Sequence, residues 1–182
     1  MKAAAYTSLI PASELYPRQA SEIRGGVIQA IINIAVAELH LPESELVVRD
    51  IRAKDDLALY SKGADADVED WACVTGTTIN AYETMTTGTM ADQRWVGLYG
   101  VKISEGCAVT ALRIATGGAQ RAIWQIQSLG LQDDWVGLSM AAVIIPQNVL
   151  YTIDRWVRQA SSSAFVLLKG VVVEPRGKLI TP

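Results

Sequence analysis

Short apolar runs separated by turn residues make up most of the chain after residue 70. The runs expected to form strands span residues 71–79, 94–103, 109–115, 120–128, 136–145, 149–157 and 165–173. Closely spaced runs bounded by Gly, Pro, Asn or Asp are typical of antiparallel sandwiches and barrels. The alternation of strands with long helices that builds a parallel sheet is missing. We therefore predict a mainly β fold, with an antiparallel β-sandwich over residues 46–178.

Several segments refine this sandwich. Gly117 and Gly118 stand between two apolar runs and favour a two-residue hairpin, because both central residues can take positive φ. The last run is apolar at odd and even positions alike, which indicates a strand covered on both faces. Residues 46–51 are predicted to form a strand rather than a helix. Residues 80–93, which carry six Thr or Met but few large branched side chains, are predicted to form a loop.

One long helix is expected near the N-terminus. Residues 1–16 mix Ala, Tyr, Ser and Pro and are predicted to form an extended arm. Pro17 suits the first turn of a helix, where its missing N–H is not needed, and Pro42 stops a helix, so we predict a hydrophobic helix over residues 17–41. Two neighbouring apolar stripes run along it: Ile23, Val27, Ile31 and Ile34 form one, and Ile28, Ile32, Ala35 and Leu39 form the other.

This helix is apolar around most of its circumference. Between residues 25 and 37 only Gln29 and Asn33 are polar, and they lie one turn apart. A helix lying on one sheet with its back to water would not need the second stripe, so cover on two sides is expected. The cover could come from the chain's own domain, from another subunit or, less readily, from a membrane. The apolar stretch is shorter than the roughly 20 residues that a membrane span requires.

If a second subunit supplies the cover, the apolar positions of the helix form the interface. The candidate interface residues are Ile23, Val27, Ile28, Ile31, Ile32, Ile34 and Leu39. A high apolar fraction agrees with burial between subunits, since 50% of the 182 residues are hydrophobic. A lone monomer would have difficulty hiding so much apolar surface.

Charge and cysteine content exclude several classes of function. Lys and Arg number 16 against 19 Asp and Glu, and the net charge of −3 argues against nucleic-acid binding through a basic surface. Cys73 and Cys107 are far apart and belong to no Cys/His cluster, so a structural zinc site is not expected, and whether the two residues pair stays open. No apolar segment typical of a secretory signal follows the first residues, which predicts a protein made and kept in a cytoplasm.

The residues that common enzyme classes need are missing or badly spaced. His40 is the only histidine, so a Ser–His–Asp triad would depend on one residue at a helix end. The segment around Ser139 resembles a nucleophile elbow only loosely, and the acidic residues 65–70 lack the Gly and Glu positions of an EF-hand. We expect no catalytic residues, no metal site and no cofactor. Trp71 and Trp135 follow acidic residues and are candidates for the rim of a ligand site.

The strands after residue 46 resemble the single jelly-roll modules of capsid and other virion proteins of bacterial and archaeal viruses. The resemblance rests on VGLSMAAVIIP (136–146), QNVLYTIDRWV (147–157) and AFVLLKGVVVEPRGK (164–178), and on an N-terminal arm and helix that lead into the strands. It implies a structural subunit that acts by self-assembly. Its partners would be copies of itself and other virion proteins, and its location the virion, assembled in the host cytoplasm. The arm and helix would clasp neighbouring subunits.

Two other classes of function stay open. A lectin-like or receptor-binding sandwich would expose aromatic side chains such as Trp71 or Trp135 and form a small oligomer. An enzyme that works with carboxylates alone would need a pocket holding a carboxylate with a raised pKa.

Overall fold

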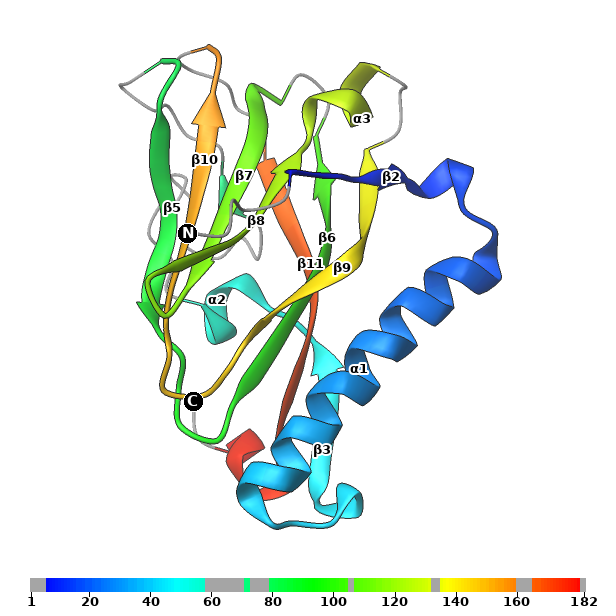
Figure 1. Cartoon of the computed structure of the whole chain (residues 1–182), viewed down its shortest axis with the longest axis vertical. Helices are drawn as coiled ribbons and strands as arrows, with labels where there is room; N and C mark the ends of the chain where they lie inside the picture. Colours follow the sequence, from blue (N-terminus) through cyan, green and yellow to red (C-terminus); the bar gives the residue numbers. More distant parts are fainter. Residues whose placement is uncertain are drawn as a thin grey trace.

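The computed structural model describes residues 6–57, 71–72, 79–104, 107–131, 135–159 and 165–180, and they form a β-sandwich with one long helix on it (Figure 1). The five-stranded sheet has the order β1 (Tyr6–Ser8), β8 (Ala119–Gln125), β7 (Val109–Thr116), β10 (Leu150–Val157), β5 (Tyr82–Thr89). The six-stranded sheet has the order β2 (Ile10–Pro11), β9 (Val136–Ile145), β6 (Trp95–Ile103), β11 (Phe165–Pro175), β3 (Leu46–Asp50), and β4 (Trp71–Ala72) also pairs with β11. The predicted mainly β fold, with a sandwich and one long N-terminal helix, is confirmed.

The strand pairing follows the plan of a long hairpin rolled up on itself. Apart from the short strands β1, β2 and β4, eight strands remain, and they pair antiparallel from the outside inward. The pairs are β3 with β11, β5 with β10, β6 with β9, and β7 with β8. The first and third of these pairs lie in one sheet and the second and fourth in the other, which is the connectivity of a jelly roll.

The hairpin between β7 and β8 forms as the sequence predicts. Thr116 pairs with Ala119, so the loop has two residues. Both are glycines with positive φ, 59° at Gly117 and 74° at Gly118. Positive φ at both positions gives the turn a twist that matches the twist of the two strands.

The helix α1 (Pro17–Leu39) forms a third layer on the outer face of the six-stranded sheet, where it packs on β6, β9 and β11 (Figure 1). The apolar face of the helix contacts Trp95 and Tyr99 of β6 and Val171 of β11. Tyr16 precedes the helix, and its backbone N–H donates to Oε1 of Gln19 at 3.0 Å, which satisfies one of the polar groups that a helix start leaves open.

The last strand lies in the middle of this stack, as its two apolar faces predict. Val166, Leu168 and Val172 of β11 belong to the core between the two sheets. Val171 and Val173 point the other way and belong to the core under α1. Each face of β11 therefore meets a different layer, which accounts for the run of Val and Leu without polar alternation.

The prediction of a loop over residues 80–93 is wrong, because Tyr82–Thr89 form β5 at the edge of the five-stranded sheet. Thr is β-branched and suits a half-buried strand. The partner strand also stabilises this segment: the Thr87 hydroxyl contacts the Tyr151 carbonyl at 3.0 Å, and the Thr84 hydroxyl donates to Asp154 at 3.0 Å. Pairing with a distant strand outweighs the weak local signal.

Other boundaries differ in smaller ways. The strand predicted over residues 120–128 ends at Gln125, and a short helix, α3 (Gln127–Leu131), follows it. A second short helix, α2 (Ala53–Asp56), comes after β3, and 3₁₀ turns span Ala12–Glu14, Glu43–Glu45 and Arg176–Ile180. In the predicted arm, β1 pairs with β8 and β2 with β9 of the same chain.

Candidate assembly surface

The seven candidate interface residues divide into two groups. Val27, Ile31 and Ile32 of α1 are buried on the side of the helix that faces its own chain, and Ile31 is 0% exposed. Their partner is the six-stranded sheet, so they present no surface to a second subunit. Ile23, Ile28, Ile34 and Leu39 are partly buried at the margins of the same contact. The two stripes are adjacent and make one wide face, which explains why a single sheet covers so much of the helix.

The opposite face of α1 is exposed and carries no charge over almost four turns. No Asp, Glu, Lys or Arg occurs between Arg24 and Glu38. The exposed positions in this stretch are Gly25, Gly26, Gln29, Ala30, Asn33 and Ala37. The two amides bond to each other, with Gln29 Nε2 donating to Asn33 Oδ1 at 3.0 Å. A surface helix usually places charged residues on the face that meets water, so this face is unusual.

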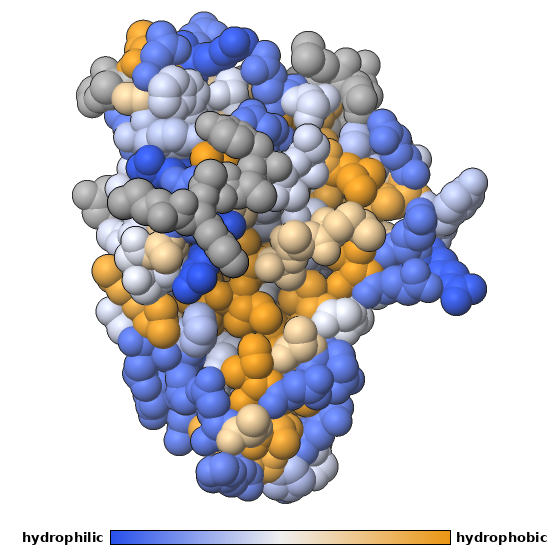
Figure 2. All heavy atoms as spheres, in the orientation of Figure 1, coloured by the Kyte–Doolittle hydropathy of each residue, from blue (hydrophilic) through white to orange (hydrophobic). Residues whose placement is uncertain are grey.

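A groove of ≈430 Å³ runs between α1 and β9. Apolar side chains gather in the hollow beside the helix (Figure 2). The lining residues are Glu22, Ile23, Gly26, Val27, Ala30, Met140, Ala142 and Ile144. Glu22 is the one charged residue among them, and its carboxylate is engaged by Arg18 at 2.7 Å. The groove is therefore an apolar depression with one solvent-exposed ion pair at its rim.

A bulge in β9 forms the outer wall of this groove. Leu138 pairs with Gly100 and Val143 with Leu98, so the intervening residues of β9 face a single residue of β6. The buried Ser139 hydroxyl donates to the Ala141 carbonyl at 2.8 Å and accepts from the Ala141 N–H at 3.2 Å. These two bonds fix the bulge. Met140 projects from it and is 72% exposed.

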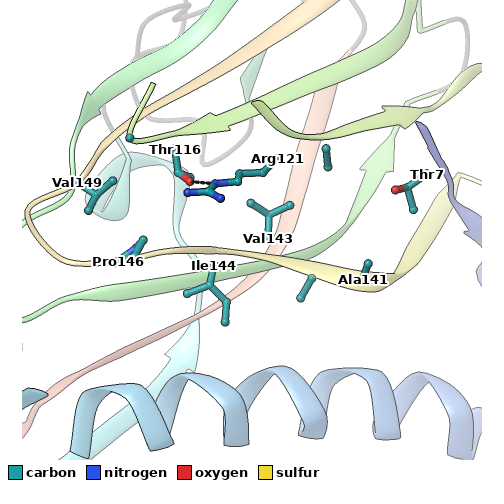
Figure 3. Close-up of a pocket in the computed structure, with 11 residues that line it drawn as sticks. Thr7, Thr116, Arg121, Ala141, Val143, Ile144, Pro146 and Val149 are labelled. Atoms are coloured by element: carbon teal, nitrogen blue, oxygen red, sulfur yellow. Dashed lines mark hydrogen bonds between the residues drawn. The ribbon is translucent and has the colours of Figure 1, made fainter. Parts of the chain in front are cut away.

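A second depression lies between the two sheets, beside the same bulge. This cleft has a volume of ≈540 Å³ and lies between β8 and β9 (Figure 3). Val143 points into the cleft, whereas Ile144 points from β9 toward α1. Arg121 Nε donates to the Thr116 hydroxyl at 2.7 Å across its upper wall. The two depressions thus share β9 as their common wall.

The buried carboxylates of the described residues all bind arginine. Asp56 accepts from Arg49 at 2.6 Å, and Glu174 accepts from Arg49 at 3.0 Å and from Arg94 at 2.8 Å. These bonds join β3, α2 and β11 to Arg94, the residue before β6. The bond to Asp56, followed by that to Glu174, raises the pKa of Arg49, whereas burial opposes the rise. Such a saturated network holds a fold in register.

A third buried carboxylate belongs to a cluster on the outer face of the five-stranded sheet. Asp154 accepts from Arg113 Nε at 2.9 Å, and the Arg113 guanidinium lies 4.1 Å from the centre of the Tyr82 ring. Tyr82 and Trp156 meet edge to face, with their centres 5.0 Å apart. Sequence analysis missed this cluster, because its residues come from three strands that are distant in the chain.

One titratable group lies under α1. Burial raises the pKa of Tyr99, and nearby Asp50 raises it further, whereas Arg24 lowers it. Arg24 in turn donates to Asp50 at 2.8 Å, which joins α1 to β3. This ion pair and Tyr99 close one flank of the contact between the helix and the sheet.

The remaining sequence candidates lie elsewhere. Trp135 is partly buried against the sandwich core, and the side chain of Trp71 lies outside the described residues. Cys107 is half-buried and Cys73 lies outside the described residues, so their pairing stays untested. The described ranges hold no cluster of metal-ligating side chains. None of the helices in the described part of the chain has the length and hydropathy to cross a membrane.

No family model matches the sequence, and a search of curated proteins finds no match.

Proposed function

We propose that this chain is a structural subunit that acts by self-assembly, as a capsid or capsid-associated component of a virion. The observation that carries the proposal is the exposed, uncharged face of α1 between Arg24 and Glu38. Subunits that stay monomeric usually place charge on such a face, and buried interface cores are depleted of charged residues. The face therefore suits contact with protein better than contact with water.

The fold supports the same proposal. Jelly rolls form the shells of many viruses, although lectin domains and other proteins share the fold, so the fold alone does not decide the function. In this chain a helix layer is added to the jelly roll, and its outer face and the neighbouring groove are the parts that suit assembly. The described part of the arm pairs with the same chain, β1 with β8 and β2 with β9, so the proposal rests on the helix layer.

A lectin-like or receptor-binding module is the second candidate. The cluster of Tyr82, Trp156, Arg113 and Asp154 favours it, because aromatic rings and fixed polar groups are the components with which proteins bind saccharides. The cluster lies on the sheet opposite to α1, so the two candidates involve different faces of the molecule.

Electron microscopy of the concentrated, purified chain tests the proposal. We expect closed particles, rings or sheets with a repeating subunit. Uniform single subunits at every concentration, together with binding to a glycan array, would favour the lectin-like alternative instead.

A further inference from the structure

We propose that two copies of the chain pair about a two-fold axis, with Met140 of each copy inserted into the groove between α1 and β9 of the other. This inference rests on the proposed function of self-assembly and identifies the contact through which it begins. The pairing needs a hollow, a projecting side chain that fits it, and a reason for the hollow to be kept open. Each of these is present on one patch of the surface.

A glycine of α1 lines the hollow although no contact inside the described chain requires it. At Gly97 of β6 a Cβ atom would lie 2.4 Å from Ile31 and 2.5 Å from Val27, so packing inside the chain requires glycine there. At Gly25 and Gly26 of α1 a Cβ atom would meet nothing within 4 Å. Each glycine in a helix interior costs about 1 kcal/mol relative to alanine. No contact within the described residues requires glycine at either position, and of the two only Gly26 lines the groove, where a closely approaching second copy would require it.

The projecting side chain is held out by the bulge. Met140 is the most exposed large apolar side chain of the described strands, and the two bonds of the Ser139 hydroxyl hold its backbone in place. Methionine is flexible and polarisable, and it fills irregular apolar hollows well. A fixed backbone that presents an adaptable apolar side chain suits insertion into a partner.

Self-complementarity identifies a second copy as the occupant. A two-fold interface uses the same patch on both partners, so the patch must supply a projection and a matching hollow. Met140 and the groove residues Gly26 and Ala30 lie on this one patch. A second copy would place its Met140 beside Gly26 and Ala30 and receive the same side chain in return. At the rim, Glu22 forms an exposed ion pair with Arg18, so its charge would not have to be buried without a partner.

The test compares three variants of the full chain by sedimentation velocity over a concentration series. Met140→Glu and Ala30→Glu place a charge in the proposed contact. Leu150→Glu is the matched control, since Leu150 is also an exposed apolar strand residue, 51% exposed, and lies outside the groove. We expect the first two to weaken self-association at least about tenfold, because a charge would be buried without a partner. Leu150→Glu should associate as the wild type does.

The outcomes separate this inference from the function on which it rests. Wild-type protein that never associates would overturn both. Wild-type association that survives Met140→Glu and Ala30→Glu unchanged would overturn the pairing and leave self-assembly intact. Circular dichroism of each variant checks that it is folded.

Disulfide cross-linking provides a second measurement, which detects the proposed contact directly and does not depend on a variant that weakens association. Two chains in which Cys73 and Cys107 are replaced by alanine would be mixed, one carrying Met140→Cys and the other Ala30→Cys. Mild oxidation should join one copy of each into a disulfide-linked pair. Absence of the mixed pair, while the wild type associates under the same conditions, would contradict the inference.

Discussion

The contact between α1 and β6 depends on the absence of one methyl group. Gly97 lets Ile31 and Val27 lie directly on the strand, and any larger residue would have to displace them. Gly26 lies on α1 itself, on the side away from β6, and a Cβ atom there would meet no neighbouring atom within 4 Å. Substitution by alanine should therefore change the free energy of unfolding in opposite directions at Gly97 and Gly26.

We predict opposite effects of Gly97→Ala and Gly26→Ala on the free energy of unfolding. Gly97→Ala should lower it by about 1–3 kcal/mol, because overpacking displaces buried side chains. Gly26→Ala should raise it by about 0.5–1 kcal/mol, since alanine is the better helix former and its Cβ has open space. Urea denaturation at one dilute protein concentration measures both. Equal stability of Gly97→Ala and the wild type would show that α1 does not press on β6.

Sequence analysis located single residues well where their role is local. The positive φ of Gly117 and Gly118 follows from their place between two apolar runs. Arg49 and Glu174, in contrast, are 125 positions apart, and no pattern in the sequence pairs them. The same holds for Met140: its strand was predicted, but the exposure of its side chain follows from a bulge that only the register with β6 determines.

At the scale of elements, α1 was predicted within a few residues, because Pro17 and Pro42 mark its ends and two stripes mark its faces. What covers the stripes could not be decided from periodicity, which reports the presence of a partner and not its identity. The error at β5 has a related cause. Its Thr residues are stabilised by β10, and contacts across 60 or more positions leave no mark on local composition.

Substitutions at Ile31 test whether α1 is a layer of the monomer. Ile31→Val should lower the free energy of unfolding by about 0.5–1.5 kcal/mol and Ile31→Ala by about 2–5 kcal/mol, since the side chain is fully buried within the chain. Ile31→Asp should prevent folding. Thermal or urea unfolding of the dilute monomer measures the series. If Ile31→Ala leaves the dilute monomer as stable as the wild type, the helix is covered by another molecule and not by its own sheet.

At the scale of the whole molecule, the described residues form three layers, and the outer helix layer has no charge on its exposed face between Arg24 and Glu38. The four antiparallel strand pairs of the jelly roll supply hydrogen-bond partners for the backbone N–H and C=O groups of the strands. The buried arginine network joins β3 and β11 to Arg94, the residue before β6. These features account for a stable subunit, whereas the uncharged face of α1 and the groove beside it account for how subunits would meet.

The most direct measurement is the absolute mass of the purified wild-type chain by light scattering behind a sizing column, over a series of loading concentrations. The account predicts a mass that rises with concentration, first to two chains and then to a larger assembly. A mass of one chain at every concentration would contradict it, because the uncharged face of α1 would then meet only water.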